Sequence, residues 1–393
     1  MQFDIVIAGG GPAGLSLATA LGGSGLAVAV VERQPEADLA APEFDGREIA
    51  LTHRSVALLQ ALGAWERIPD AEKSEMAVAR VLNGGSLYAM NFTPASGGPL
   101  GHLAPNHLIR AAVYQTAIAQ PEVTLLAGVS VTAVRTTATG AGVTLSDGRE
   151  ITARLVVAAD TRFSELRRRQ GIPAQMRDFG RVMMVCRVEH DLPHEGVATE
   201  WFDYGQTIAM LPINGNRSSF VLTLPAREMD KVMALDEAAF GAEATRRYRE
   251  RLGQMRLVSK RIAYPLVTVY AERFVAERFA LVGDAAVGMH PVTAHGFNFG
   301  LRGADALARR IRAAAAKGAD IAAPALLKAY EREHRMATLP TYASTNATAR
   351  LFTDDRRPVR MLRDAMLRVG NLAAPVRGLI TRHLMESGRP KLA

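Results

Sequence analysis

Short apolar runs and helical periodicity alternate at the start of the chain. Residues 3–8 read Phe-Asp-Ile-Val-Ile-Ala and are followed by glycines, which predicts a buried parallel strand. The pattern predicts a helix over 12–23 and a second strand over 26–31. Strand, helix and strand within about 30 residues make a βαβ unit. We therefore expect the chain to open with a parallel-sheet domain.

A different pattern fills the middle of the chain. From about 179 to 270, alternation of apolar and polar residues dominates, which predicts an antiparallel sheet. A buried strand returns at 279–282, and a helix from about 297 to 317 follows it. The simplest assembly returns this late strand to the first sheet and leaves the middle sheet as an insertion. The other expected elements are helices at 54–62, 106–119 and 236–253, and strands at 123–134, 142–146, 151–158, 182–188, 197–202, 207–212, 218–224 and 257–264.

The turn after the first strand carries a dinucleotide-binding motif. Gly9, Gly11 and Gly14 form G-x-G-x-x-G between a strand and a helix. The first glycine allows a tight turn, the second lets the backbone approach a diphosphate, and the third lets the helix pack close to the sheet. Pro12 suits the first helical position, Ala13 follows it, and the helix N-terminus attracts the diphosphate.

An acidic residue completes this motif. Glu32 ends the second strand, where its carboxylate is placed to accept hydrogen bonds from ribose hydroxyls, and Arg33 follows it. Glycine turns alone are common, but the strand, the helix and the acid occur together here. The sequence therefore predicts a bound dinucleotide, and this motif leaves FAD and NAD both open.

A second segment decides between these cofactors. Residues 279–286 form a buried strand that ends in Gly-Asp, and Asp284 is placed to accept from a ribitol hydroxyl. The next helix N-terminus would face the flavin edge that becomes negative on reduction. NAD has no ribityl chain and needs no such segment, so FAD is the expected cofactor. The residues expected to contact it here are Pro291, Gly296, Phe297 and Asn298.

Together these segments resemble the two fingerprints of the group A flavoprotein monooxygenases, the para-hydroxybenzoate hydroxylase-like fold. The resemblance covers most of the chain, and by it Arg47 and Arg110 are similar to the flavin-contacting arginines of the family. Within that family the chain looks most like the ubiquinone-biosynthesis hydroxylases of the UbiH and UbiF type, in their UbiM-like branch. The supporting stretches are Ala209-Met210-Leu211-Pro212, Tyr264-Pro265-Leu266 and residues 290–302.

The resemblance implies a fold and a reaction. The fold is α/β, with a Rossmann-like FAD-binding domain, an inserted antiparallel β-sheet substrate domain and a helical C-terminus. FAD, O2 and a reductant (NAD(P)H or another donor) would form a flavin C4a-hydroperoxide that hydroxylates a prenylated phenol or benzoquinol ring in ubiquinone biosynthesis. His295 is the candidate catalytic residue, as a proton relay or a contact to the phenolic hydroxyl. Met210 and Pro212 either line the substrate cavity or serve ordinary sheet packing.

These elements predict a division of the chain into two interleaved domains and a tail. The FAD-binding domain is expected to take 1–72, 101–178 and 271–345, the substrate domain 73–100 and 179–270, and a basic helical C-terminal segment 346–393.

Three departures from the family pattern keep other functions open. Thr161 stands where the middle Asp-Gly motif has glycine, Val287 stands where histidine is usual, and His295 stands where glutamine is usual. Glycine would relieve a strained turn, so Thr161 weighs against docking of a pyridine nucleotide. The alternatives are an NAD(P)H-dependent hydroxylase of a small soluble phenol, a non-catalytic flavin-binding accessory protein of a quinone biosynthetic complex, and a flavin reductase or isoprenoid desaturase.

Composition removes several classes of protein. Cys186 is the only cysteine, which excludes an intrachain disulfide and a cysteine-rich zinc site. No apolar run approaches the ~20 residues of a membrane span. The N-terminus has no basic region of the kind that opens a secretory signal. We expect a cytoplasmic protein without a metal site.

Positive charge is concentrated at the C-terminal end. Residues 350–393 hold ten Lys and Arg against four Asp and Glu, which accounts for most of the formal net charge of +8. Apolar residues recur there at helical spacing. This segment is expected either to lie on the inner membrane surface, where it would deliver a prenylated substrate, or to pack on the protein itself. A nucleic acid partner is not expected, because the arginines lack interleaved aromatic residues.

Overall fold

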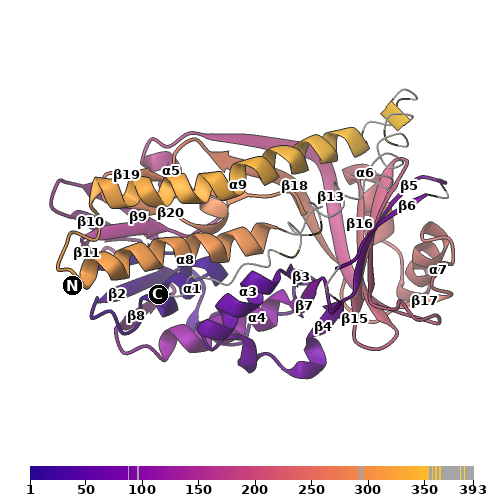
Figure 1. Cartoon of the computed structure of the whole chain (residues 1–393), viewed down its shortest axis with the longest axis horizontal. Helices are drawn as coiled ribbons and strands as arrows, with labels where there is room; N and C mark the ends of the chain where they lie inside the picture. The colour runs from indigo at the N-terminus through magenta and orange to yellow at the C-terminus, as the bar shows by residue number, and fades with distance from the viewer. Residues whose placement is uncertain are drawn as a thin grey trace.

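Two sheets of different kinds form the body of the molecule (Figure 1). The structure is a computed structural model and describes residues 1–86, 88–94, 97–291 and 295–353, together with 356, 359, 360, 363, 381 and 385. The first sheet, called here the parallel sheet, lies at one end of the molecule, and helices α8 and α9 run alongside it. The second, called here the large sheet, lies at the other end with helix α7 beyond it.

The parallel sheet is built from apolar runs that are buried on both faces. In β1, Ile5, Val6 and Ile7 have no exposed surface, as expected for a strand covered by helices on each side. The late strand β20 pairs in parallel with β12, which itself pairs with β1, so the predicted return of the late strand is confirmed. The strands in spatial order are β19 (Val275–Ala276), β20 (Phe279–Leu281), β12 (Leu155–Ala158), β1 (Ile5–Ala8), β2 (Val28–Glu32) and β8 (Val123–Ala127).

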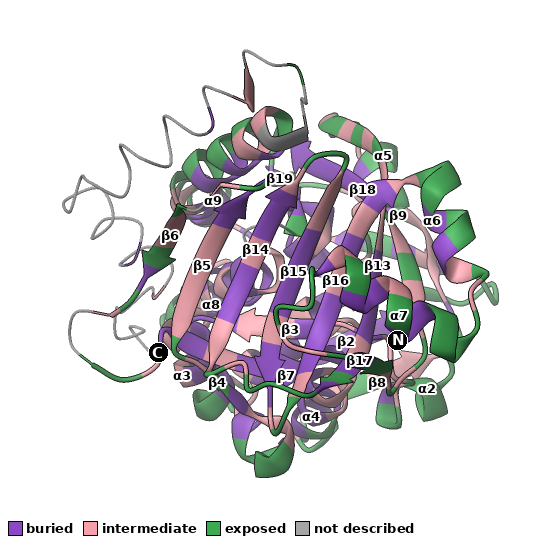
Figure 2. Ribbon diagram, turned by 90° about the vertical axis from the view of Figure 1, so that its right-hand side faces the viewer, coloured by how far each residue is buried: buried purple, intermediate pink, exposed green. Residues whose placement is uncertain are grey.

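The large sheet has two faces of different character. Its outer face carries a separate apolar core with Cys186, Met210 and Phe220, against which α7 residue Phe240 packs. Figure 2 looks onto this sheet, where β14, β15 and β16 lie side by side and are largely buried. Its inner face turns toward the parallel-sheet domain. The strands are β21 (Val287–Gly288), β18 (Ile262–Ala271), β13 (Ala174–His190), β16 (Arg217–Pro225), β15 (Gln206–Ile213), β14 (Val197–Asp203), β5 (Val78–Asn83) and β6 (Ala89–Phe92), with β17 (Met255–Leu257) on β13.

Two small antiparallel sheets and the helices complete the described fold. One small sheet holds β9 (Val131–Thr136), β10 (Ala141–Leu145) and β11 (Glu150–Ala153), and the other holds β3 (Glu48–Leu51), β7 (Gly101–Pro105) and β4 (Ser74–Met76). The helices are α1 (Pro12–Leu21), α2 (Glu36–Ala40), α3 (His53–Ala61), α4 (Asn106–Ile118), α5 (Glu165–Arg169), α6 (Ala226–Met233), α7 (Glu237–Arg247), α8 (Gly296–Ala315) and α9 (Pro324–Thr353), with 3-10 turns η1 (Trp65–Arg67), η2 (Asp70–Glu72) and η3 (Gly283–Ala285).

The predicted α/β fold is confirmed, and the structure corrects several element boundaries. The strand predicted over 123–134 is two strands, because Gly128 takes a left-handed φ of 75° and turns the chain. The strand predicted over 151–158 breaks at Arg154, where the chain leaves a small sheet and joins the parallel sheet. The helix predicted over 236–253 ends at Arg247, and Arg249 and Glu250 then take φ near 55°. Helix α6 was not predicted.

Two long strands join the parallel-sheet domain to the large sheet. β13 and β18 pair with each other, with a shift in register between Asp178 and Val182. β13 runs through the expected domain boundary at 178, and β18 ends at Ala271, next to the expected boundary at 270. The exact division into domains therefore stays a prediction. The predicted C-terminal segment 346–393 lies mostly outside the described residues.

The outer core predicts a local effect on stability. Phe220 is fully buried in this core and faces away from the parallel sheet, so Phe220→Ala should lower the free energy of unfolding by about 3–5 kcal/mol without lowering FAD retention in the folded protein. Urea unfolding and flavin absorbance measure the two quantities. Val258→Ala is the control, because Val258 is 47% exposed and should change stability by less than ~0.5 kcal/mol. Loss of flavin from folded Phe220→Ala would contradict the expectation.

Candidate functional site

The turn after β1 can be built only with glycine at two positions. Gly9 has a φ of 120°, and a Cβ there would lie 2.5 Å from the carbonyl oxygen of Ala159. A Cβ on Gly14 would lie 2.0 Å from the carbonyl oxygen of Gly9. Both approaches are closer than carbon and oxygen tolerate. The glycines therefore let β1, α1 and the end of β12 meet.

The surroundings of Gly11 are open, in contrast to those of Gly9 and Gly14. A Cβ on Gly11 would meet nothing within 4 Å, so the space in front of this residue is open. Gly11 is the N-cap of α1, Pro12 follows it, no side chain caps this helix, and no acidic residue occupies the first turn. The first N–H groups of α1 therefore face open space with the positive end of the helix dipole behind them, which is the arrangement that binds a diphosphate.

Glu32 lies beside this turn, as the motif predicts. Its carboxylate accepts hydrogen bonds from the backbone N–H of Gly10 at 2.6 Å and of Gln34 at 2.9 Å. These bonds fix the carboxylate at the end of β2, next to the glycine turn. Arg33 is exposed.

The late segment meets the opening turn directly. A Cβ on Gly283 would lie 2.9 Å from the Cβ of Ala13, and a Cβ on Gly300 would lie 3.5 Å from the Cα of Gly283 and 3.7 Å from the Cβ of Ala13. The start of α1, the turn η3 and helix α8 therefore share one contact point. Two stretches nearly three hundred residues apart in sequence form one site.

Asp284, in η3, is held by Arg162, which is not among the predicted site residues. Its Oδ2 accepts hydrogen bonds from Nη2 of Arg162 at 2.8 Å and from Nε at 3.2 Å. Arg162 comes from the loop after β12 and also donates to the carbonyl of Val267 at 2.8 Å. Thr161 in this loop has no left-handed φ, so the backbone strain that argued against docking of a pyridine nucleotide is not present.

Arg47 belongs to a cluster of polar groups at the edge of the large sheet. Its guanidinium lies 2.6 Å from the Asp45 carboxylate and 5.4 Å from the centre of the Tyr264 ring. The Tyr264 hydroxyl donates to the backbone carbonyl of Asp45 at 2.8 Å. Burial acts to raise the pKa of Asp45, but Arg47 and Asn106 outweigh it and the pKa is lowered. Burial acts to lower the pKa of Arg47, but Asp45, Tyr264 and Asp284 together raise it.

Asp284 of the late segment contributes less than Asp45 and Tyr264 to the raised pKa of Arg47. Arg47 is the first arginine of the family pattern. The second, Arg110, donates to Oε1 of Gln34 at 3.1 Å, close to the end of β2.

The start of α8 is bonded to β3 and to the residue that follows it. The amide nitrogen of Asn298 donates to the carbonyl of Ala50 at 2.9 Å, and its oxygen accepts from the N–H of Thr52 at 3.2 Å. Asn298 therefore positions the helix with its side chain. His295 occupies the N-cap position of α8 without a capping bond from its side chain, is buried, and lies with its ring centre 5.5 Å from that of Phe299.

The remaining residues of this segment differ in exposure. Gly296 begins α8, Phe297 is half-buried and Pro291 is exposed. Burial lowers the pKa of His290 to about 4, so its ring is neutral near pH 7. Residues 292–294 lie outside the described part of the chain. A catalytic role of His295 stays a prediction.

The two candidates for the substrate cavity lie on the outer face of the large sheet, and their role in substrate binding stays a prediction. Met210 is buried in the outer core that α6 and α7 cover, and Pro212, two residues along the same strand, shares its face. The side chains of the adjacent residues Ala209 and Leu211 lie on the inner face. Side chains alternate along a strand, so an error of one residue exchanges the two faces.

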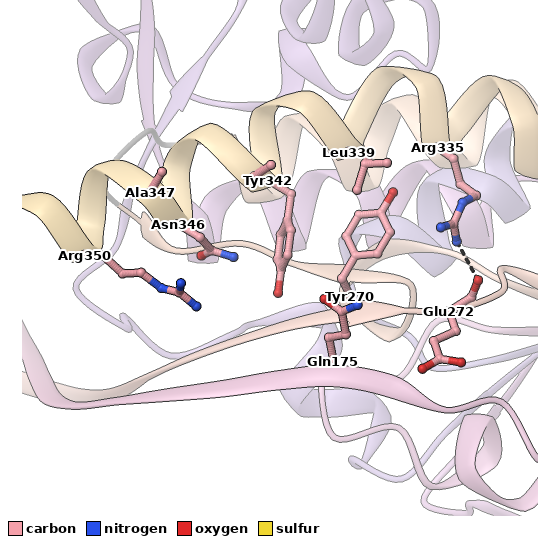
Figure 3. Close-up of a pocket in the computed structure, with 10 residues that line it drawn as sticks. Gln175, Tyr270, Glu272, Arg335, Leu339, Tyr342, Asn346, Ala347 and Arg350 are labelled. Carbon is pink, nitrogen blue, oxygen red and sulfur yellow. Dashed lines mark hydrogen bonds between the residues drawn. The ribbon is translucent and has the colours of Figure 1, made fainter.

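A separate recess of about 370 Å³ lies between α9 and the β13–β18 ribbon (Figure 3). Tyr270 and Tyr342 line it, and their rings lie 4.8 Å apart. Arg335 donates to the carbonyl of Glu272 at 2.7 Å. None of the residues predicted to contact the cofactor lines this recess, so it is not part of the candidate site.

Comparison with known proteins agrees with this geometry. A family model described as an FAD binding domain matches residues 2–339. The chain is 45% identical over 390 residues to the ubiquinone hydroxylase UbiM of Neisseria meningitidis, which covers 98% of this chain and 85% of that protein. It is 39% identical over 383 residues to the ubiquinone hydroxylase UbiL of Rhodospirillum rubrum, and the match covers 97% of this chain and 89% of that protein. The chain belongs to this FAD-binding family.

The fold of the flavoprotein also matches solved structures. PqsL of Pseudomonas aeruginosa, described as a probable FAD-dependent monooxygenase, superposes with a TM-score of 0.75 at 23% identity over 94% of this chain and 100% of PqsL. The predicted family, the predicted FAD cofactor and the predicted class, an FAD-dependent oxidoreductase, are confirmed. The open N-terminus of α1, the Glu32 carboxylate and the adjoining η3 turn fit a bound FAD.

Three residues of the site are not among those predicted from the sequence. Asp45 and Tyr264 lie next to Arg47, and Arg162 lies next to Asp284. Arg162 follows the middle Asp160-Thr161 motif, which is the signal that could have identified it. Nothing in the local sequence of Tyr264 indicates its partner.

The open space in front of Gly11 leads to a prediction about FAD binding. Gly11→Val adds atoms only where the diphosphate is expected, so FAD affinity should fall at least about tenfold, or ~1.4 kcal/mol, while the apoprotein keeps its thermal unfolding midpoint. Absorbance of the bound flavin and thermal unfolding of the apoprotein measure the two effects.

Gly14→Ala is the matched control for this prediction. Its added carbon would lie 2.0 Å from the Gly9 carbonyl oxygen, so this variant should lose stability whether or not FAD is present. A yellow, fully loaded Gly11→Val protein would refute the placement of the diphosphate.

Proposed function

We propose that this flavoprotein hydroxylates the ring of a prenylated phenol or benzoquinol in ubiquinone biosynthesis, using O2 and a reductant. Two relatives that match nearly the whole chain are named ubiquinone hydroxylases. The observation that carries the proposal is the contact of α1, η3 and α8 at Ala13, because it assembles one flavin site beside the inner face of the large sheet.

Each part of this site has a task that its chemistry suits. The N-terminus of α1 would bind the FAD diphosphate, Glu32 a ribose, and Asp284 the ribityl chain. Bound FAD supplies the reaction with O2 that delivers one oxygen atom to the ring. Arg47, held by Asp45, would place a positive charge at the flavin. The inner face of the large sheet would hold the substrate ring and exclude water.

The product decides between the proposed reaction and its alternatives. The FAD-loaded protein is incubated with 2-geranylphenol, isotopically labelled O2 and NADPH or photochemically reduced flavin, and the product is analysed by mass spectrometry. We expect the gain of one labelled oxygen atom. A change of two hydrogens instead would indicate a desaturase, and flavin turnover without a modified phenol would indicate a reductase. Strong stimulation of NADPH oxidation by unprenylated phenol, with turnover of that phenol, would favour the small-phenol hydroxylase.

We also propose that the basic segment 350–393 brings the enzyme to an anionic membrane surface, where a prenylated substrate is dissolved. The support is its excess of six positive charges between apolar residues at helical spacing. In the described part of the chain, no helix has the length and apolar character needed to cross a bilayer.

Vesicle binding tests the membrane proposal. The full-length protein should co-sediment with vesicles that contain anionic lipid, less so at high salt, and a variant lacking 350–393 should stay in the supernatant. Vesicles of neutral lipid are the control. Equal partition of the two proteins would refute the proposal.

A further inference from the structure

One carboxyl group stands in a row of otherwise apolar side chains that crosses the large sheet. Glu200, in β14, pairs with Ala209 of β15, which pairs with Val221 of β16. Val221 pairs with Val185 of β13, and on the other side Glu200 pairs with Val81 of β5. Residues directly opposite in neighbouring strands share a face, so Glu200 is the one acidic member of this row.

Contacts identify the face to which this row belongs. A Cβ on Gly46 would lie 2.7 Å from Cγ2 of Val185, and Gly46 adjoins Arg47 of the candidate flavin site. The next residue along β14, Trp201, is buried in the outer core on the opposite face. Glu200 therefore turns toward the flavin domain. It stands three strand spacings of about 4.8 Å, or roughly 14 Å, from Val185.

Among the residues that the structure describes, no charged partner accounts for the position of this carboxyl. Within the part of the chain that the structure describes, Glu200 makes no hydrogen bond or ion pair with its side chain. Burial alone raises its pKa to about 8. The residue nevertheless keeps accessible surface and is only half-buried, so it is not sealed in a core. Unpaired carboxyls in such surroundings are costly and are typical of functional sites.

We propose that Glu200 is a catalytic residue that accepts the hydrogen bond, and then the proton, of the hydroxyl on the substrate ring. This inference rests on the proposed function. The O–H bond of the phenol breaks, the carboxylate becomes a carboxylic acid, and the electron pair stays on the ring oxygen as phenolate. The negative oxygen enriches the ring in electrons at the carbon that takes up oxygen. The proton returns to the phenolate oxygen of the product. The apolar row on either side would hold the ring and its prenyl substituent.

The acid–base properties of the two groups suit this transfer. A free phenol such as that of tyrosine has a pKa near ~10, and an effective base has a pKa close to the working pH. The raised pKa of Glu200 lies closer to the pKa of the phenol than the pKa of an ordinary glutamate does.

The test compares two ligands on two variants of the full-length, FAD-loaded protein. The ligands are 2-geranylphenol and its methyl ether, which lacks the donated proton, and their affinities are read from the change in flavin absorbance. The wild-type protein should prefer the phenol about 10- to 100-fold, and Glu200→Gln should reduce this preference to about threefold or less. The turnover number of Glu200→Gln should fall about 100-fold with unchanged FAD content.

Two further variants separate this role from a structural one. Glu189→Gln makes the same change on an exposed residue of β13 and should keep both the preference and the turnover. Glu200→Leu removes the half-buried carboxyl and should raise the thermal unfolding midpoint while losing the preference for the phenol, so a poorly folded glutamine variant does not prevent the test. If Glu200 had only a structural role, its substitution would weaken the binding of both ligands equally.

The outcomes bear differently on the two proposals. If Glu200→Gln and Glu200→Leu keep the wild-type preference for the phenol, the assignment of Glu200 is overturned and the proposed function stands. If the wild-type protein neither binds nor hydroxylates 2-geranylphenol, the proposed function fails and the assignment fails with it.

Discussion

The close approach of Ala13, Gly283 and Gly300 is the constraint on which the rest of the structure depends. A Cβ on Gly283 would lie 2.9 Å from the Cβ of Ala13, so glycine at this position lets the start of α1 and the turn η3 meet, and Gly300 brings α8 into contact with both. The contact places an uncapped helix N-terminus, a carboxylate at the end of β2 and a carboxylate in η3 around one space. The FAD-binding character of the chain follows from this arrangement.

The large sheet is held against this site by polar contacts that cross from one domain to the other. Arg187 on β13 forms ion pairs with Glu48 at 2.7 Å and Glu72 at 2.9 Å, and Tyr264 on β18 donates to Asp45. Removing one partner of a buried pair leaves an uncompensated charge, so these contacts fix orientation more than they add stability. They hold the inner face of the sheet beside Asp45 and Arg47, and β13 and β18 extend from these contacts into the rest of the sheet.

The candidate site was predictable from sequence wherever a local pattern carries the chemistry. The glycine turn, Glu32 and the Gly-Asp of η3 each follow a buried strand, and glycines and a carboxyl at the ends of parallel strands are typical of a dinucleotide site. Met210 and Pro212 could not be assigned to a face from sequence, because their strand is apolar on both faces and alternation does not tell which face is inner. Arg162 and Tyr264 were not assigned to the site because their partners lie far away in the chain.

The sequence alone determined the kind of fold, the two segments that bind the cofactor, and FAD as that cofactor, because each depends on short-range spacing of glycines, acids and apolar runs. Only the tertiary structure decided that Arg162 holds Asp284, that Thr161 is unstrained, and that Glu200 rather than Met210 faces the flavin domain. These facts depend on strand register and on contacts between distant residues. A local pattern does not contain either of them, because the same alternating strand can present either face to its partner.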